Sequence, residues 1–496
     1  MPEKDSTREP AGDVTRSSDA VSRRLQEAGA RFRRGLSFAW EGQDAEAAEA
    51  FREAVILRPD WAEAHNNLGA VLGRQGRFDE AIESCGRAAG LHPGFALPHV
   101  NLGRCYAGLR RFADAADAFR RGAALGPGLF EAHANLAEAL TLLGRHREAA
   151  DKCRDAARLA PGNTRVRVLL GEALCRLGEF QEAALVFRDA LGIDPARREA
   201  LRGLGWACAA SGDLEEAAEA FRREIGEAPG EALPRYNLGT VLGNTGRFGE
   251  ATLLFREAAA LAPGHAETHY NLGVCLFRAH QHRQAAAAFR DALRARPAYT
   301  RARYNLGVSL FECGRYDEAA AAFRDTLRDR PDHARGRYNF GRACAALGRL
   351  RDAIGAFTEA TRLSPGHVPS RLALGALLYR QGDFKAASEA FRETIRLRPK
   401  DARAHNGMGA ALFRLSRPAE AREAFHAAVR ISPAGREANF NLGLCLLLEK
   451  DQEGAKRQLS VLSTLDPQLA ARYATLLRSR LGMIPERPTP PRRPGP

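Results

Sequence analysis

A period of 34 residues constrains this chain more than any other feature of its sequence. Thirteen repeats of 34 residues run from residue 28 to residue 469 without an insertion or a deletion, and they make up 442 of the 496 residues. A proline marks the same place in every repeat, at residues 59, 93, 127, 161, 195, 229, 263, 297, 331, 365, 399, 433 and 467. A fixed period of this length is typical of a solenoid, in which each repeat packs only on its neighbours.

Each repeat is predicted to form two short helices. With Thr300 as position 1 of repeat 9, glycine fills position 8 in twelve repeats, alanine fills position 20 in all thirteen, and phenylalanine fills position 24 in ten. A glycine within a helix costs about 1 kcal/mol relative to alanine. Its recurrence therefore predicts a close approach of the two helices, with the glycine against the alanine at position 20. The usual glycine at position 15 is expected to end the first helix, and the proline at position 32 the second.

The succession of Leu306-Gly307, Ala319–Phe323 and Pro331 resembles the tetratricopeptide repeat family, and it recurs over about nine-tenths of the chain. The resemblance implies an all-α fold, a right-handed α-solenoid superhelix of about 13 tandem 34-residue helix–turn–helix repeats. It also implies that the first helices line the concave face and that proteins are the usual ligands. The family usually has a large apolar residue at position 4, whereas this chain has His65, His99, His133, His269, His405, Arg303, Arg337 and Arg371.

The repeats are expected to form one solenoid over residues 19–469, with Asp19 capping its first helix. Residues 1–18 are polar and charged and are expected to be disordered. Residues 470–482 are expected to form a capping helix, apolar at Tyr473 and Leu477. Residues 483–496, rich in proline and arginine, are expected to be disordered, and their segment PTPPRR fits either a ligand of SH3-like domains or a plain linker.

The net charge of +14 and the pI near 9.7 favour an anionic partner such as a nucleic acid. Arginine supplies nearly all of this charge, because the chain has only six lysines, and GC-rich codons alone would also enrich arginine. The nine cysteines lack C-x-x-C spacing and are expected to be buried, reduced thiols, which suits a cytoplasmic protein. We expect no export signal and no membrane span, since the apolar runs are too short to cross a bilayer.

None of the G-x-S-x-G, P-loop, HExxH or paired-cysteine motifs occurs, so we expect no enzymatic activity, no cofactor and no metal. His265 and His269 have a spacing of four residues, which can hold a metal on a helix. Because Pro263-Gly264 places His265 in a turn, we interpret both as ordinary turn histidines.

Three sets of side chains on the first helices are candidates for ligand contact. Asparagine at position 6 offers a donor and an acceptor to a peptide backbone, in an arrangement that resembles the asparagine ladder in the repeat domain of O-GlcNAc transferases, without their catalytic domain. The alternative is that this asparagine is common in the family and only orders the helix. The ladder comprises Asn67, Asn101, Asn135, Asn237, Asn271, Asn305, Asn339 and Asn441. The tyrosines beside its second half are Tyr236, Tyr270, Tyr304 and Tyr338, and the arginines expected in the groove are Arg301, Arg335, Arg342 and Arg380.

We therefore predict a non-enzymatic scaffold that binds extended, acidic or neutral peptide segments of other proteins in its concave groove. Repeats 7–10 should carry the strongest site, separated from an earlier one by a weaker pattern in repeats 5 and 6. The alternative is a nucleic-acid-binding protein with arginine-rich surfaces, for which affinity would fall steeply with salt. The arginines at position 25 are usually followed by Asp or Glu, and this pairing predicts a solvated outer face.

Overall fold

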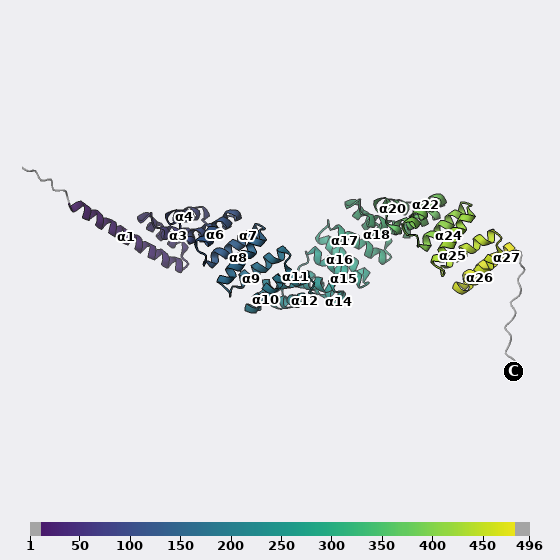
Figure 1. Ribbon diagram of the computed structural model, residues 1–496, viewed down its shortest axis with the longest axis horizontal. Coiled ribbons are helices and arrows are strands. Elements are labelled where there is room, and N and C mark those ends of the chain that lie inside the picture. Colours follow the sequence, from purple (N-terminus) through teal and green to yellow (C-terminus); the bar gives the residue numbers. More distant parts are fainter. Residues whose placement is uncertain (1–10, 482–496) are drawn as a thin grey trace, which may run out of the picture. The chain divides into compact units, whose positions relative to one another are not determined.

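The computed structural model describes residues 11–481 and the side chains of residues 20–479. This part of the chain consists of 27 α-helices joined by short turns and contains no strand (Figure 1). It divides into two compact units, Met1–Arg247 and Phe248–Pro496. Each unit is an all-α solenoid of helix pairs, as the 34-residue period predicted. None of the described helices is long and apolar enough to cross a membrane.

In the N-terminal unit, the first helices of repeats 1–7 are α1 (Ala11–Trp40), α3 (Ala62–Arg74), α5 (Ala96–Gly108), α7 (Phe130–Leu142), α9 (Thr164–Leu177), α11 (Arg198–Ser211) and α13 (Ala232–Asn244). The second helices of repeats 1–6 are α2 (Asp44–Leu57), α4 (Phe78–Leu91), α6 (Phe112–Leu125), α8 (His146–Leu159), α10 (Phe180–Ile193) and α12 (Leu214–Glu227).

The C-terminal unit begins with α14 (Phe248–Leu261). Its first helices are α15 (Ala266–Arg278), α17 (Thr300–Glu312), α19 (Ala334–Ala346), α21 (Val368–Gln381), α23 (Ala402–Arg414) and α25 (Arg436–Leu448). The second helices that follow them are α16 (His282–Ala295), α18 (Tyr316–Asp329), α20 (Leu350–Leu363), α22 (Phe384–Leu397), α24 (Pro418–Ile431) and α26 (Gln452–Leu465), and the chain ends its described part in α27 (Pro467–Leu481).

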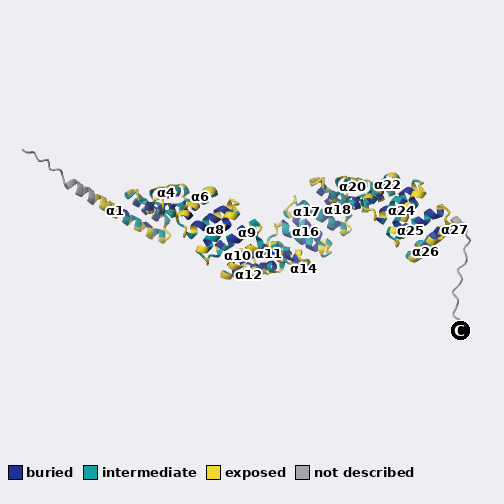
Figure 2. Cartoon of the chain, viewed as in Figure 1, coloured by how far each residue is buried: buried dark blue, intermediate teal, exposed yellow. Residues whose placement is uncertain are grey.

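Within each unit the first helices form the inner layer of the stack. First helices of successive repeats contact one another; α3 contacts α5, for example, and α21 contacts α23. Each second helix packs mainly on the first helix of its own repeat and on the first helix of the following repeat. Helices that contact across repeats lie on the inside of a curved stack, so the first helices line its concave side. The buried residues, dark blue in Figure 2, lie where the paired helices face each other.

The glycine at position 8 allows a close contact, but its partner differs from the expected one. A Cβ placed on Gly307 would lie 2.7 Å from Cε1 of Phe323, the phenylalanine at position 24 of the same repeat. The expected partner at position 20, Ala319, is fully buried beside this contact. Repeat 4 has alanine instead of glycine, Ala137, and it also has the smaller Cys153 at position 24, both without exposed surface. In repeat 9 the phenylalanine ring is therefore the group beside the glycine, whereas in repeat 2 a Cβ on Gly69 would meet Sγ of Cys85.

Position 15 has the left-handed conformation in all thirteen repeats. Nine repeats have glycine there, with φ between 74° and 95°, and the other four have Arg110, His280, Ser416 and Lys450, with φ between 58° and 61°. A residue with a Cβ is strained in this region of backbone conformation, whereas glycine is not. The turn between the two helices of a repeat therefore requires a left-handed backbone conformation at position 15, which explains why glycine is the most frequent residue there.

The two ends of the solenoid differ from the prediction. Helix α1 begins at Ala11, so residues 11–18, expected to be disordered, are helical, and Asp19 lies inside the helix instead of capping it. At the other end α27 begins at Pro467, three residues before the expected start of the capping helix. The carboxylate of Asp466 accepts hydrogen bonds from the backbone N–H groups of Gln468 and Leu469, so an Asp-Pro helix start replaces the usual turn. Residues 1–10 and 482–496, including most of the expected N-terminal disordered segment and nearly all of the proline-rich tail, lie outside the described residues.

The nine cysteines are free thiols, as expected from their spacing. Seven are buried, and Cys175 and Cys313 are partly exposed. Burial raises the pKa of the thiols of Cys85 and Cys153 to about 12. These thiols therefore act as small apolar side chains in the core.

Replacing Gly307 by alanine should destabilise repeat 9 by about 1–3 kcal/mol, because the new methyl group meets the ring of Phe323. Replacing Phe323 by cysteine removes the obstacle and reproduces the Ala137–Cys153 pair of repeat 4. The double variant should therefore be more stable than the sum of the two single changes, by about 1 kcal/mol or more, when urea midpoints are compared. Strictly additive changes in stability would show that the ring of Phe323 is not the reason for a glycine at position 307.

Replacing Gly314 by alanine should lower the urea midpoint, because left-handed backbone costs a residue with a Cβ about 1 kcal/mol or more. Gly355, in the middle of α20 and with nothing within 4 Å of its missing Cβ, provides the matched control. Gly355→Ala should raise stability by about 0.5–1 kcal/mol through helix propensity. Changes of the same sign in both variants would contradict this interpretation of position 15.

Candidate functional site

The asparagines at position 6 link neighbouring first helices in the C-terminal unit. Nδ2 of Asn305 on α17 donates a hydrogen bond of 3.2 Å to Oη of Tyr270 on α15. Nδ2 of Asn339 on α19 donates one of 2.8 Å to Oη of Tyr304 on α17. In both cases the acceptor is the residue at position 5 of the preceding repeat. The amide donors that were expected to face a ligand are thus used within the protein.

The same bond occurs without tyrosine where position 5 is itself an asparagine. Nδ2 of Asn101 donates to Oδ1 of Asn66 at 2.9 Å, and Nδ2 of Asn441 donates to Oδ1 of Asn406 at 3.0 Å. The bond therefore requires an oxygen on the side chain at position 5.

Three other asparagines of the ladder, Asn67, Asn135 and Asn237, do not make this hydrogen bond. Position 5 of the preceding repeat is Phe32 for Asn67 and Val100 for Asn135, and neither side chain can accept a hydrogen bond. Asn237, on α13 beside Tyr236, is buried, and its Nδ2 meets no acceptor among the described residues. The ladder is therefore discontinuous, and Asn305 and Asn339 form its asparagine–tyrosine part in the C-terminal unit.

The tyrosines at position 5 are held by aromatic rings on two sides. The ring of Tyr304 lies 5.8 Å from that of Phe323 and 4.9 Å from that of His333, which meets it edge-on. Burial raises the pKa of the Tyr304 phenol, so the phenol stays protonated at neutral pH. Tyr338 and Tyr270 have equivalent neighbours, namely Phe357 with His367 and Phe289 with Tyr299. These residues at position 34 were not among the predicted site residues, although aromatic side chains recur there two residues after the proline.

Three of the four candidate arginines are exposed and have no ion pair. Arg301, Arg335 and Arg380 make no hydrogen bond or ion pair with the described residues. Arg342 is half-buried instead: its guanidinium carbon lies 4.2 Å from the centre of the Phe311 ring, and Nη1 donates to Oδ1 of Asn339 at 3.5 Å. The inner layer of repeats 9–11 therefore presents three positive charges to solvent.

The side chains at position 4 have a structural role that explains the departure from the family. Nε2 of His269 lies 2.9 Å from the carbonyl oxygen of Pro263, and Nη2 of Arg371 donates to the carbonyl oxygen of Pro365 at 2.9 Å. Because a carbonyl only accepts, the histidine must carry its proton on Nε2. The same tether to the proline six residues earlier involves His65, His133, Arg303, His405 and Asn439. His265 caps the start of α15 and meets Oγ1 of Thr268, as expected for a turn residue, whereas His269 lies in the first turn of α15 and not in a turn between helices.

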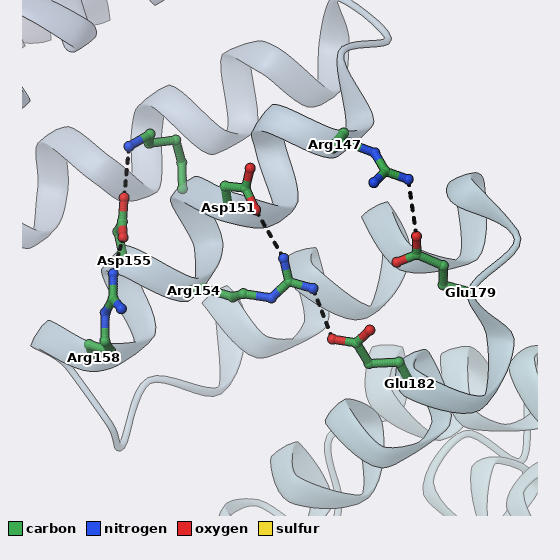
Figure 3. A network of polar contacts seen from close by, with 8 residues as sticks. Arg147, Asp151, Arg154, Asp155, Arg158, Glu179 and Glu182 are labelled. Carbon is green, nitrogen blue, oxygen red and sulfur yellow. Dashed lines mark hydrogen bonds and ion pairs between the residues drawn. The ribbon is translucent and has the colours of Figure 1, made fainter.

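The arginines of the second helices are largely paired, but mostly not with the acidic residue that follows them in sequence. Arg154 on α8 donates to Asp151 on the same helix at 3.0 Å and to Glu182 on α10 at 2.8 Å (Figure 3). The second of these contacts crosses to the next repeat, 28 residues on, and equivalent pairs join Arg52 to Glu80, Arg188 to Glu216 and Arg290 to Glu318. Ion pairs between repeats thus neutralise much of the outer layer.

The two layers of repeats 9–12 consequently differ in charge. The first helices α17, α19, α21 and α23 contain nine arginines and a single acidic residue, Glu312. The second helices α18, α20, α22 and α24 contain nine basic and ten acidic residues. The positive charge of this segment therefore lies on the inner layer. An anionic partner would be attracted to that layer, because opposite charges attract most strongly where no counter-charge is present.

Two hollows share Tyr270 and Asn305 in their linings, the first formed mainly by α17, α18 and the turn after α18, and the second lying between α15 and α17. The first has a volume of about 200 Å³ and is lined by Thr300, Arg301, Tyr304, Thr326, Arg330 and His333 besides the two bonded residues. The second has a volume of about 300 Å³ and is lined by Val274, Phe277, Arg278, Phe289 and Val308 besides the same two. Both hollows open next to the ladder, so one bound chain could occupy them together.

Comparison with known proteins identifies the repeats. A family model described as tetratricopeptide repeat matches residues 100–164, 167–232, 309–368, 372–436 and 411–459, which together make up more than half of the chain. Two further models of this repeat match residues 62–95 and 35–76. A model described as subunit 3 of the anaphase-promoting complex, cyclosome, matches residues 244–326. No curated protein matches the chain.

Several solved structures are similar over parts or most of the chain. YrrB, described as a TPR protein with an unusual peptide-binding site, is 24% identical, with 38% of this chain and 96% of YrrB aligned and a TM-score of 0.35. MamA from Desulfovibrio magneticus RS-1 is 25% identical over 34% of this chain and 96% of its own, with a TM-score of 0.33. A chain of the APC/C hetero-tetramer Cut9–Hcn1 is 13% identical over 91% and 96%, with a TM-score of 0.36.

Replacing Asn339 by alanine should lower stability by about 0.5–1.5 kcal/mol, because it removes the hydrogen bond to Tyr304. Tyr304→Phe should cost a similar amount, and the double variant little more than either single one, when urea midpoints are compared. Asn135 is the matched control, since Val100 offers it no acceptor, and Asn135→Ala should be nearly neutral. An equal loss in the Asn339 and Asn135 variants would show that the bond between repeats is not what these asparagines contribute.

Proposed function

Since this chain belongs to the tetratricopeptide repeat family, whose members are protein-interaction scaffolds, we propose that it binds extended, acidic peptide segments of partner proteins. The site is the inner layer of repeats 8–12 in the C-terminal unit, from α15 to α23. No catalytic step is part of this proposal. The free thiols favour a reducing compartment such as the cytoplasm as the place of action.

The exposed, unpaired arginines of the inner layer carry this proposal. Arg301, Arg335 and Arg380 come from three successive repeats, and Glu312 is the single acidic residue of the first helices of repeats 9–12. The same repeats pair Arg328, Arg362 and Arg396 with acidic residues on the second helices. The two layers hold equal numbers of basic residues, nine on each, so the asymmetry lies in the acidic residues, one on the first helices and ten on the second. An inner layer without neutralising acids favours an anionic ligand.

The ladder contributes acceptors to this site in place of the expected amide donors. Nδ2 of Asn305 is bonded to Tyr270, which leaves Oδ1 of the asparagine and the hydroxyl proton of the tyrosine for a peptide backbone. First helices of neighbouring repeats pack roughly 10 Å apart, and an extended chain rises about 3.3 Å per residue. Each step from one repeat to the next therefore spans about three ligand residues, and the four steps from repeat 8 to repeat 12 span about twelve.

The proposal can be tested with a displayed library of random twelve-residue peptides selected on the full chain. Wild-type protein should enrich peptides rich in Asp and Glu. The triple variant Arg301→Gln, Arg335→Gln, Arg380→Gln should bind the selected peptides roughly ten- to a hundredfold more weakly, because each exposed ion pair contributes about 0.5–1 kcal/mol. Fluorescence anisotropy with the labelled peptides measures the difference.

The matched control removes three charges from the outer layer of the same repeats, through Arg328→Gln, Arg362→Gln and Arg396→Gln. It should bind the peptides almost as well as wild type, since these arginines lie on the second helices. Equal losses in the two triple variants would mean that only net charge matters. A library without enriched peptides, together with tight binding of random single-stranded RNA that weakens linearly in the logarithm of salt, would replace this proposal by nucleic-acid binding.

A further inference from the structure

The two hollows beside the Tyr270–Asn305 bond differ in chemistry, and together they can determine which peptide sequence binds. This inference rests on the proposed function and makes its ligand more specific. Both hollows lie within the C-terminal unit, the first against α17, α18 and the turn after α18 and the second between α15 and α17. The bonded pair lines both of them and so forms the wall between them. The side chains that line the two hollows can therefore be compared directly.

The first hollow is suited to an anion. The residues that line it include Arg301, Arg330, Thr300 and Tyr304, and none of them is acidic. Arg301 has no ion pair among the described residues, and the nearest acid to Arg330 is Asp332, with 3.8 Å between Nε and Oδ1. A carboxylate or phosphoryl group in this hollow would meet donors on several sides.

The second hollow is suited to an apolar side chain. Val274 on α15 and Val308 on α17 occupy the same repeat position, and Phe277 and Phe289 complete the apolar lining. Arg278 is exposed at its edge. Filling such a hollow with an aliphatic or aromatic group removes apolar surface from water, which is the main source of affinity in small recognition sites.

The wall between the hollows is fixed in place. Nδ2 of Asn305 is bonded to Oη of Tyr270, and the tyrosine ring packs at 5.8 Å from Phe289 and at 5.0 Å from Tyr299. The Tyr270 hydroxyl proton and Oδ1 of Asn305 can engage one backbone C=O and one N–H of a peptide crossing the wall. Successive side chains of an extended chain point to opposite sides. A chain that runs along the ladder therefore directs one residue into each hollow.

We propose that the junction of repeats 8 and 9 reads two adjacent residues of a bound peptide, an anionic one in the hollow of Arg301 and an apolar one in the hollow of Val308. Arg301 and Val308 are seven residues apart on α17, about 10 Å along the helix axis. Two neighbouring side chains that leave an extended backbone in opposite directions span a similar distance.

The library selected for the proposed function tests this pairing. Wild-type protein should enrich peptides in which Asp or Glu adjoins Leu, Ile, Val, Met or Phe, in one of the two orders. Val308→Arg should abolish the preference for an apolar residue and keep the preference for an acidic one. The double variant Arg301→Gln, Arg330→Gln should abolish the preference for an acidic residue and keep the preference for an apolar one. Val308→Ser serves as a second variant if the arginine impairs folding. Ala376→Arg, at the same position two repeats further on, is the matched control and should leave the pair preference unchanged.

Adjacency is tested with labelled peptides taken from the selected pool. Inserting one serine between the anionic and the apolar residue should weaken binding about tenfold, because only one of the two can then reach its hollow. Replacing the acid by phosphoserine distinguishes the two sources of anion: tighter binding assigns the hollow to a phosphoryl group, and weaker binding to a carboxylate.

The inference and the proposed function can fail separately. Acidic peptides without a preference for an adjacent apolar residue, and with affinity unchanged by Val308→Arg, would overturn the pairing and leave acidic peptide binding in place. Equal affinity of the peptide with the inserted serine would also overturn it. If no peptide is selected at all, the proposed function fails, and the pairing fails with it.

Discussion

The contact between a glycine on the first helix and a phenylalanine ring on the second is the interaction on which the rest of this solenoid depends. The ring takes the space where a Cβ would be, so the two helices of a repeat approach closely and at nearly the same place each time. Repeat 13 makes the same contact with a ring from a different helix. It has Leu459 at position 24, and the ring of Tyr473 from α27 meets Gly443 instead, fully buried and with its hydroxyl donating to the carbonyl oxygen of Gly443. The terminal helix thus ends the stack by repeating its central contact.

Regular packing of this kind places equivalent side chains in two continuous layers, and the two layers use their charges differently. On the outer layer, arginines bridge to acidic residues of the next repeat, as Arg154 does to Glu182. Such exposed pairs contribute little stability individually, but they leave few free charges. On the inner layer of repeats 9–11, Arg301, Arg335 and Arg380 have no such partner. The surface available to an anionic ligand results from this absence of neutralising acids more than from the total charge of the chain.

The asparagine–tyrosine ladder joins neighbouring repeats, and under the proposed function the same residues would also contact the ligand. Its amide donors connect one repeat to the next, so they are not available to a ligand, and the remaining oxygen and hydroxyl groups suit any peptide backbone equally. A backbone contact cannot distinguish one sequence from another. Sequence preference must therefore come from the sides of the ladder, where the hollows at the junction of repeats 8 and 9 offer charge on one side and apolar surface on the other.

The sequence alone determined the number and order of the helix pairs within the repeats, because the period of 34 residues and its glycines and prolines mark the ends of the helices, but it did not determine where the first and last helices begin. It also located the candidate tyrosines, asparagines and arginines on one layer, since a strict repeat puts equal positions on equal faces. Only the tertiary structure decided what those residues contact. Gly307 meets Phe323 and not Ala319, Asn339 donates to Tyr304, and Arg371 tethers the preceding turn. Each of these partners depends on how neighbouring helices are placed in space, and a repeat pattern contains no information about that distance.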